Sequence, residues 1–187
     1  NPDVNAFTQY YGSSAADASL LLMPLVGFLP ATDPRVLGTV AHVERDLIED
    51  GYVRRYRTAG RAHVDGLPPG EGTFLACSFW LADNYALQGR IGDARALFER
   101  ALREFVGLGH KRGIARVLEG FACLAQLLGH HERALVLVGA AEAVRRALSA
   151  GLRAADQAAF AATLEPAWRA LDPKQAQSAW AAGGRMS

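Results

Sequence analysis

Cysteine, methionine, net charge and long apolar runs are all scarce in this 187-residue chain, and each scarcity excludes a class of protein. The two cysteines, Cys77 and Cys123, lie in apolar helical stretches, so no disulfide framework of a small secreted domain is encoded. We predict two buried thiols in a cytoplasmic protein. The longest apolar run, Leu20–Leu29, is interrupted by Pro24 and Gly27 and is too short to span a membrane. A formal charge of +1 provides no general attraction to nucleic acid or to an acidic membrane.

The charge is distributed unevenly, and the chain starts abruptly. Residues 1–88 carry six arginines against ten acidic residues, a net charge of −4, whereas residues 89–187 carry fourteen basic against nine acidic residues, a net charge of +5. The first residues are Asn-Pro-Asp-Val, without methionine and without a basic segment followed by an apolar one. We therefore expect a piece of a longer protein, or a fusion of two segments near Gly89.

Alanine, leucine, arginine and glutamate dominate the chain, so the sequence predicts an all-α fold. Two Asp-Pro steps, at Asp33 and Asp172, are typical helix starts: an acidic N-cap is followed by proline at the first helical position. After the first of them, one helix face is apolar at Val36, Val40, Val43, Leu47 and Ile48. The predicted helices cover residues 33–51, 72–87, 92–108, 111–128, 131–148, 155–171 and 172–182, and residues 52–56 could be extended.

An internal repeat with an offset of 40 residues is present in the middle of the chain. Residues Leu87–Ala94 and Leu97 align with Leu127–Ala134 and Leu137. In both copies a short glycine-containing turn precedes an alanine in the first turn of the next helix, which allows two antiparallel helices to pack closely. Antiparallel helix hairpins build both tetratricopeptide-like repeats and α/α barrels. We expect a partial barrel-like part followed by tetratricopeptide-like repeats.

The most distinctive stretch is Gly66–Ala82, where the loop Gly-Leu-Pro-Pro-Gly-Glu-Gly leads into the apolar run Thr-Phe-Leu-Ala-Cys-Ser-Phe-Trp-Leu-Ala. Over about residues 5–100 the chain resembles the bacterial branch of glycoside hydrolase family 15, the glucoamylase- and trehalase-like enzymes. The resemblance implies part of an (α/α)6 barrel that cleaves terminal glucose from α-glucosides with inversion. The other matching stretches are Phe7–Ser13, Asp17–Leu22, Pro24–Pro30, Asp33–Val36 and Ala94–Arg100.

The catalytic residues that this resemblance implies are missing from the sequence. An inverting glycosidase needs one protonated and one ionised carboxylate, roughly 6.5–9.5 Å apart across the scissile bond. In the resembled family the acid glutamate precedes the Tyr-Gly-Ser segment, and the base glutamate lies in a Glu-Glu-Tyr-Asp-like stretch beyond the Leu-Phe-Glu helix. This chain starts after the position of the acid glutamate, loses the family's pattern before that of the base glutamate, and contains no Glu-Glu pair. We therefore predict no catalytic residue and an isolated chain that is inactive.

Three residues match substrate-binding positions of the family. Arg55 and Tyr56 match the Arg-Tyr that contacts the terminal sugar, and Glu71 matches the substrate-side loop. Arg55 also fits a surface or ion-pairing arginine, and Glu71 a carboxylate that favours a helix N-terminus. Asp17 fits a helix cap. Asp65 and Glu71 could also form an acid/base pair of their own across the Pro-Gly loop.

Residues from about Gly92 to Arg185 resemble a second family, the C-terminal helical repeats of large ATP-dependent bacterial regulators, including LuxR-family ones. This resemblance implies a tetratricopeptide-like scaffold over residues 91–187, behind a hydrolase fragment over residues 1–90. The sequence has no Gly-x4-Gly-Lys-Ser/Thr loop and no recognisable DNA-reading module. The matching stretches are Ala101–Phe105, Leu108–Ala115, Leu118–Ala122, Glu132–Leu135, Gly139–Ala143 and Ala179–Gly183.

Other conspicuous side chains favour structural roles. The three histidines His110, His130 and His131 lie at helix junctions, and the adjacent His130 and His131 cannot face the same way on a helix. Metal ligands converge from fixed elements, so we expect solvated histidines, no metal and no cofactor. The basic residues Arg145, Arg146 and Arg153 predict a solvated helix face. The tryptophans Trp168 and Trp180 predict core anchors of the last helices.

Three functional classes follow from the sequence. The first is an α-glucosidase-like protein of carbohydrate metabolism, by descent. The second is a helical-repeat module that binds a protein partner or a second copy of itself through exposed helical faces. The third is a non-catalytic remnant that binds glucose or an α-glucoside through Arg55, Tyr56 and Glu71. Neither nucleic acid nor a membrane is expected as a partner.

Overall fold

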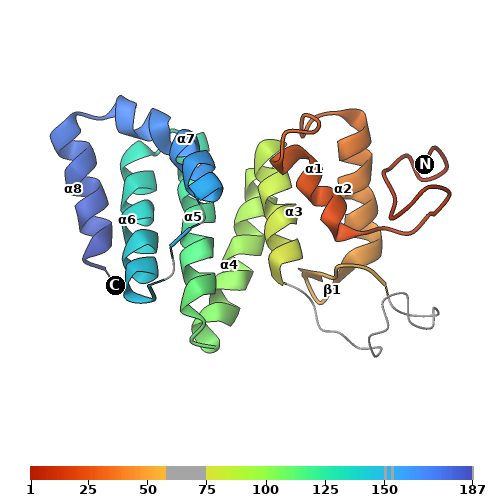
Figure 1. The fold of residues 1–187 in the computed structure, drawn as a ribbon, viewed down its shortest axis with the longest axis horizontal. Coiled ribbons are helices and arrows are strands. Elements are labelled where there is room, and N and C mark those ends of the chain that lie inside the picture. The colour runs from red at the N-terminus through yellow and green to blue at the C-terminus, as the bar shows by residue number, and fades with distance from the viewer. Residues whose placement is uncertain (58–74, 150, 153, 187) are drawn as a thin grey trace. The chain divides into compact units, whose positions relative to one another are not determined.

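The computed structural model describes residues 1–57, 75–149, 151–152 and 154–186. The chain divides into two compact units, Asn1–Leu97 and Phe98–Ser187, which we describe separately (Figure 1). The described elements are mostly helices, as the composition predicts. No helix in the described ranges is both long and apolar enough to cross a membrane.

In the first unit, the predicted start of the long helix α2 (Pro34–Leu47) is confirmed. The Asp33 carboxylate accepts a hydrogen bond from the Arg35 amide at 2.9 Å, and Pro34 is the first helical residue. The helix ends before the expected Gly51, because Asp50 and Gly51 take positive φ angles of 51° and 79° and turn the chain into a short antiparallel ladder. The other elements of this unit are the 3₁₀ helix η1 (Ala18–Leu21), α1 (Leu22–Leu25), β1 (Ile48–Glu49), β2 (Tyr52–Val53), α3 (Leu75–Leu87) and the start of α4 (Ile91–Gly107).

The core of the first unit forms where η1 packs against both α2 and α3. The predicted apolar face of α2 is buried from Val36 to Leu47, whereas Ile48 leaves the helix for β1 and is exposed. Polar side chains join the elements at buried positions. The Asn84 amide of α3 donates to the Leu21 carbonyl at 2.8 Å, and the Ser78 hydroxyl accepts from the Val53 amide at 2.9 Å. These bonds fix β2 and η1 on α3.

In the second unit, the helices start and end within two residues of the predicted positions. They are the end of α4, then α5 (Lys111–Leu127), α6 (His131–Ala147), α7 (Ala154–Ala170) and α8 (Pro173–Gly184). The Asp172 carboxylate caps α8 by accepting from the Lys174 amide at 2.7 Å, as the Asp-Pro step predicts. Helices α5, α6 and α8 run side by side, and α7 passes across them (Figure 1).

The aligned turns of the 40-residue repeat have the same backbone geometry. Gly89 and Gly129 adopt φ angles of 76° and 75°, and the next residue donates its amide back to the last turn of the preceding helix at 2.8 Å in both. Gly109, midway between them, repeats the pattern with φ 62°. Glycine is required because an L side chain is strained at such φ values. The repeat therefore encodes its turns locally.

Alanine-rich surfaces of α5, α6, α7 and α8 form the core of the second unit. Helices α6 and α8 approach so closely that a Cβ atom at Gly139 would lie 1.9 Å from the Trp180 carbonyl oxygen. Trp180 packs against this core, as predicted. The cluster consists of Ala122, Ala125, Ala134, Leu135, Val138, Leu164, Ala167, Ala176 and Ala179.

Two predictions for the second unit are wrong. Trp168 does not anchor the core: its residue is 38% exposed and is not part of the buried alanine cluster. Arg145 is not solvated: its side chain is 16% exposed and pairs with the buried Glu119 of α5, at 2.5 and 2.9 Å. Arg146 is exposed as predicted, and Arg153 lies outside the described residues.

Of the junction histidines, His110 has a clear structural role. Its Nδ1 accepts a hydrogen bond from the Gly113 amide at 3.0 Å and so caps α5. Its ring stacks on Phe105 with 5.0 Å between centroids. His131 is bonded to the Gln126 side chain at 2.9 Å. Within the described ranges no group of three or more His, Cys, Asp and Glu side chains is arranged to hold a metal ion.

Candidate substrate-binding residues after strand β2

The segment that follows β2 carries Arg55 and Tyr56, and its backbone is held from two sides. The Ala18 amide at the start of η1 donates to the Arg55 carbonyl at 2.8 Å. The Arg54 amide donates to the Leu47 carbonyl at the end of α2 at 2.9 Å. Since both partners belong to helices, the position of Arg55 is set by the core of the first unit.

Asp17 links η1 to this segment. Its Oδ1 accepts a hydrogen bond from the Ser19 amide at 2.8 Å, which confirms the expected cap. The same oxygen lies 3.9 Å from the Arg55 Nε, and the two side chains are 12% and 55% exposed. At this distance the charges attract each other without a hydrogen bond. The carboxylate therefore orients the guanidinium, whose N–H groups can still reach another acceptor.

An aromatic ring and a thiol complete the surroundings of Arg55. The guanidinium carbon lies 5.9 Å from the centre of the Tyr56 ring, within the range of a cation–π contact. Cys77 of α3 is fully buried, and burial raises the pKa of its thiol to about 11, with Arg55 lowering it and Asp17 raising it. The thiol is therefore protonated at neutral pH and is not a nucleophile.

The sequence predictions for this site have different outcomes. The structure brings Arg55 next to Asp17, which the sequence suggested only as a cap, and places its guanidinium near the Tyr56 ring. Glu71 and Asp65 lie outside the described residues. The contact between Asp17 and Arg55 joins residues 38 positions apart in the chain. Both belong to stretches that match the hydrolase family, but no local pattern places the two side chains together.

A second polar cluster in the first unit has a structural role. The Tyr85 hydroxyl of α3 donates to Glu44 of α2 at 2.6 Å, and the Arg90 guanidinium lies 2.7 Å from the same carboxylate oxygen. Arg90 also pairs with Asp93 at 2.8 Å and covers the Tyr85 ring at 4.0 Å. Burial, followed by the bond to Glu44, raises the pKa of the Tyr85 phenol above its usual range. The cluster joins α2 to α3 and to the first turn of α4.

The chemistry available around Arg55 is that of binding. A guanidinium donates up to five hydrogen bonds and does not deprotonate in proteins, so it recognises acceptors but cannot act as general acid or base. Asp17 already caps η1 and attracts Arg55. The described part of this site therefore defines a class of protein: a mostly helical domain with a half-exposed arginine that lies beside a carboxylate and a tyrosine ring.

Comparison with known proteins gives the family. Residues 1–163 match the model of the glycosyl hydrolases family 15, and the chain belongs to this family. A trehalase of Thermoplasma acidophilum is 44% identical over 110 residues, which are 58% of this chain and 18% of that protein. A trehalase of Mycobacterium tuberculosis is 51% identical over 96 residues, 51% of this chain and 14% of that protein. Trehalase 1 of Sulfolobus acidocaldarius is 32% identical over 98 residues, which are 52% of this chain and 16% of that protein. No solved structure matches.

The extent of these matches bears on the two resemblances. The chain spans less than a fifth of the length of these trehalases. The family match confirms the hydrolase resemblance and continues to residue 163, well beyond the expected limit near residue 100. The mostly helical fold is consistent with part of an (α/α)6 barrel. The regulator-like repeats after residue 91 have no support in the comparisons and stay a prediction.

Proposed function

We propose that this chain is part of a trehalase-like hydrolase and contributes one wall of its glucoside-binding site, with Arg55 and Tyr56 contacting a glucose unit. The observation that carries the proposal is the arrangement of Arg55: it is half exposed, held by its backbone to η1 and oriented by Asp17. An oriented donor loses little conformational entropy when it binds a hydroxyl group. Glu71, which matches the family's substrate-side loop in sequence, would add a carboxylate acceptor.

The chain by itself is not expected to hydrolyse its ligand. Inversion needs two carboxylates about 6.5–9.5 Å apart with water between them. Asp17, the carboxylate beside Arg55, already caps η1, and no second carboxylate is placed opposite it among the described residues of this site. Purified chain incubated with trehalose or maltose should release no glucose. Release at an enzyme-like rate would overturn this proposal and point to Asp65 and Glu71 as the acid/base pair.

Calorimetric titration with trehalose and glucose tests the binding role. Arg55→Ala removes donors to the sugar, and a hydrogen bond to a charged group contributes about 1.5–3 kcal/mol, so affinity should fall roughly ten- to hundred-fold. Arg35→Ala is the matched control, because Arg35 is an exposed arginine that pairs with Asp33 at 2.8 Å. Equal losses in both variants, or no binding by the unchanged chain, would refute the role of Arg55.

A helical-repeat interaction module is the second candidate function. The observation that favours it is the recurrence of one turn geometry at Gly109 and Gly129 within the second unit, with exposed leucines at Leu108, Leu127 and Leu128. Such leucines at successive turns would suit a protein partner or a second copy of the chain. Light scattering across a hundred-fold concentration range tests self-association. A constant monomer mass would reject the second copy as the partner.

A further inference from the structure

The second unit contains a cavity of about 720 Å³ between α6 and α7, unrelated to the sugar-binding proposal. Its size lies in the range of small-molecule binding sites. The walls are largely apolar. Val138 of α6 faces three side chains of α7: Phe160, Leu164 and the exposed Trp168. Two aromatic rings on one helix and aliphatic side chains around them suit a flat apolar body.

The deepest polar group of the cavity is the ion pair between Glu119 and Arg145. Two hydrogen bonds of 2.5 and 2.9 Å join the guanidinium to both carboxylate oxygens. The Glu119 side chain is only 7% exposed, so this pair cancels its own charge inside the protein. It adds polarity to one end of the cavity without favouring a ligand of either sign.

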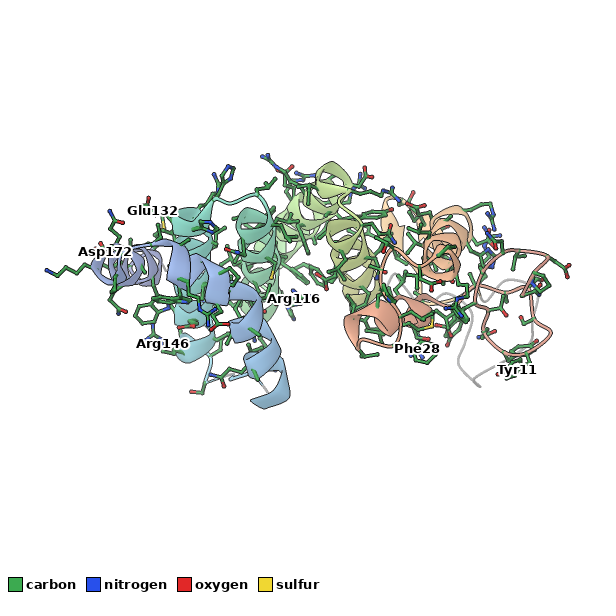
Figure 2. All side chains as sticks on the ribbon, turned by 90° about the horizontal axis from the view of Figure 1, so that it is seen from above. Tyr11, Phe28, Arg116, Glu132, Arg146 and Asp172 are labelled. Carbon is green, nitrogen blue, oxygen red and sulfur yellow. The ribbon has the colours of Figure 1, made fainter. Side chains whose placement is uncertain are left out.

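Donors are left over nearer the surface, at Arg146. This arginine lies in the last turn of α6, where Figure 2 labels it, and its guanidinium carbon is 5.8 Å from the centre of the Trp180 ring. Among the side chains that the structure describes, the two nearest ion pairs of the lining join Glu119 to Arg145 and Glu165 to Arg169, and neither includes Arg146. Glu142, one turn earlier, accepts from the Trp180 indole at 3.1 Å. Glu165, on the opposite wall, is paired with Arg169 at 2.5 Å.

We propose that this cavity binds a small amphipathic anion, a flat apolar body that carries one carboxylate or sulfonate group. The apolar body lies between Val138, Phe160 and Trp168, and its anionic group accepts hydrogen bonds from the Arg146 guanidinium. A guanidinium has parallel N–H groups that match a planar carboxylate or two sulfonate oxygens. Arg146 is therefore the group in the lining that can donate to an anion, although the carboxylates Glu142 and Glu165 also line the cavity.

Glu142 limits the affinity. It lies four residues before Arg146 on the same helix, so its negative charge repels an anion bound at that arginine. Because of this repulsion, neutralising Glu142 should tighten the binding of an anion. The binding of an uncharged ligand should stay unchanged.

Two fluorescent probes with the same aromatic body test the proposal on the full chain. They are 8-anilinonaphthalene-1-sulfonate, an anion, and N-phenyl-1-naphthylamine, its uncharged counterpart. Arg146→Gln should weaken the anion roughly five- to ten-fold and leave the uncharged probe within two-fold, and Glu142→Gln should tighten the anion alone. Trp168→Ala should weaken both probes. Arg112→Gln, at an exposed arginine of α5, is the control for loss of one positive charge and should change neither.

Several outcomes would overturn the proposal. One is an anion affinity that Arg146→Gln leaves unchanged, and another is equal affinity for both probes in the unchanged chain. If the probe fluorescence per protein chain rises with protein concentration and sedimentation gives a doubled mass, a second copy of the chain provides the site. Near-UV circular dichroism of each variant distinguishes loss of the site from loss of packing. Weakening by Arg146→Gln with an unchanged spectrum supports the proposal.

Discussion

The close contact between α6 and α8 makes the substitution Gly139→Ala a sharp test of the second unit. The added Cβ atom would lie 1.9 Å from the Trp180 carbonyl oxygen, 2.9 Å from its carbonyl carbon and 3.2 Å from the Gly184 amide nitrogen. The contact is reciprocal, because a Cβ atom at Gly183 would lie 1.8 Å from the Val136 carbonyl oxygen. Non-bonded heavy atoms prefer about 3.5–4.0 Å, so the helices would have to separate by roughly 1.5–2 Å.

The cost follows from what obstructs the methyl group. Backbone atoms of α8 cannot rotate away, so the helix must shift as a body and loosen the contacts of Ala176 and Ala179 with the core. Overpacking typically costs about 1–3 kcal/mol, and a rigid obstruction belongs at the upper end. A loss of about 3 kcal/mol in the free energy of unfolding corresponds to a melting temperature roughly 6–12 °C lower for a chain of this size.

Urea denaturation followed by circular dichroism and tryptophan fluorescence measures this loss. Gly107→Ala in the last turn of α4 is the matched control, because nothing lies within 4 Å of a Cβ atom there. Alanine should leave stability unchanged or raise it by about 0.5–1 kcal/mol. Gly120→Ala should cost no more than Gly139→Ala, since its methyl group would meet the side chain of the buried Phe98, whereas at Gly139 it would meet backbone. Equal stability of the Gly139 and Gly107 variants would refute the reasoning.

Three further results are expected. Cys77 should react with a thiol reagent much more slowly than Cys123 at pH 8, because burial holds the pKa of its thiol near 11; equal rates measured by mass spectrometry would contradict this. The hydrogen bonds from Arg35 lower the pKa of Asp33 to about 2, so its contribution to stability is present above pH 4 and is lost as the pH falls towards 2; Asp33→Asn should flatten acid unfolding over that interval. The raised pKa of Tyr85 has the opposite sign: the neutral phenol stabilises the folded state below about pH 10, so stability falls above that pH, and Tyr85→Phe should reduce this alkaline loss in thermal melts.

Helix positions were predictable from the sequence because their signals are local. An aspartate accepts the amide of the residue two positions later, and a following proline has the helical φ angle already, so Asp33 and Asp172 determine where α2 and α8 begin. Gly89 and Gly129 end their helices because few other residues adopt φ near 75°. The sequence prediction placed the end of α2 too late, because Ile48 pairs with Val53 in the ladder between β1 and β2 and so leaves the helix.

The candidate sites could be predicted only in part. Family-like stretches made Arg55 and Tyr56 candidates, and the tertiary structure added Asp17 as the charged neighbour of Arg55. Arg145 has the sequence surroundings of a solvated residue, yet it is buried because Glu119 of another helix faces it. Trp168 has the sequence surroundings of a core residue, yet it lines a cavity.

From the sequence alone came the helical class, the turns and the family, together with the prediction that the catalytic glutamates are absent. The tertiary structure alone decided which arginine is buried, which tryptophan is exposed and which carboxylate faces Arg55. The physical reason is the sequence distance over which the interactions act. Caps and glycine turns are determined by atoms within about five residues, whereas burial and ion pairing depend on side chains from distant segments that meet only when the helices pack.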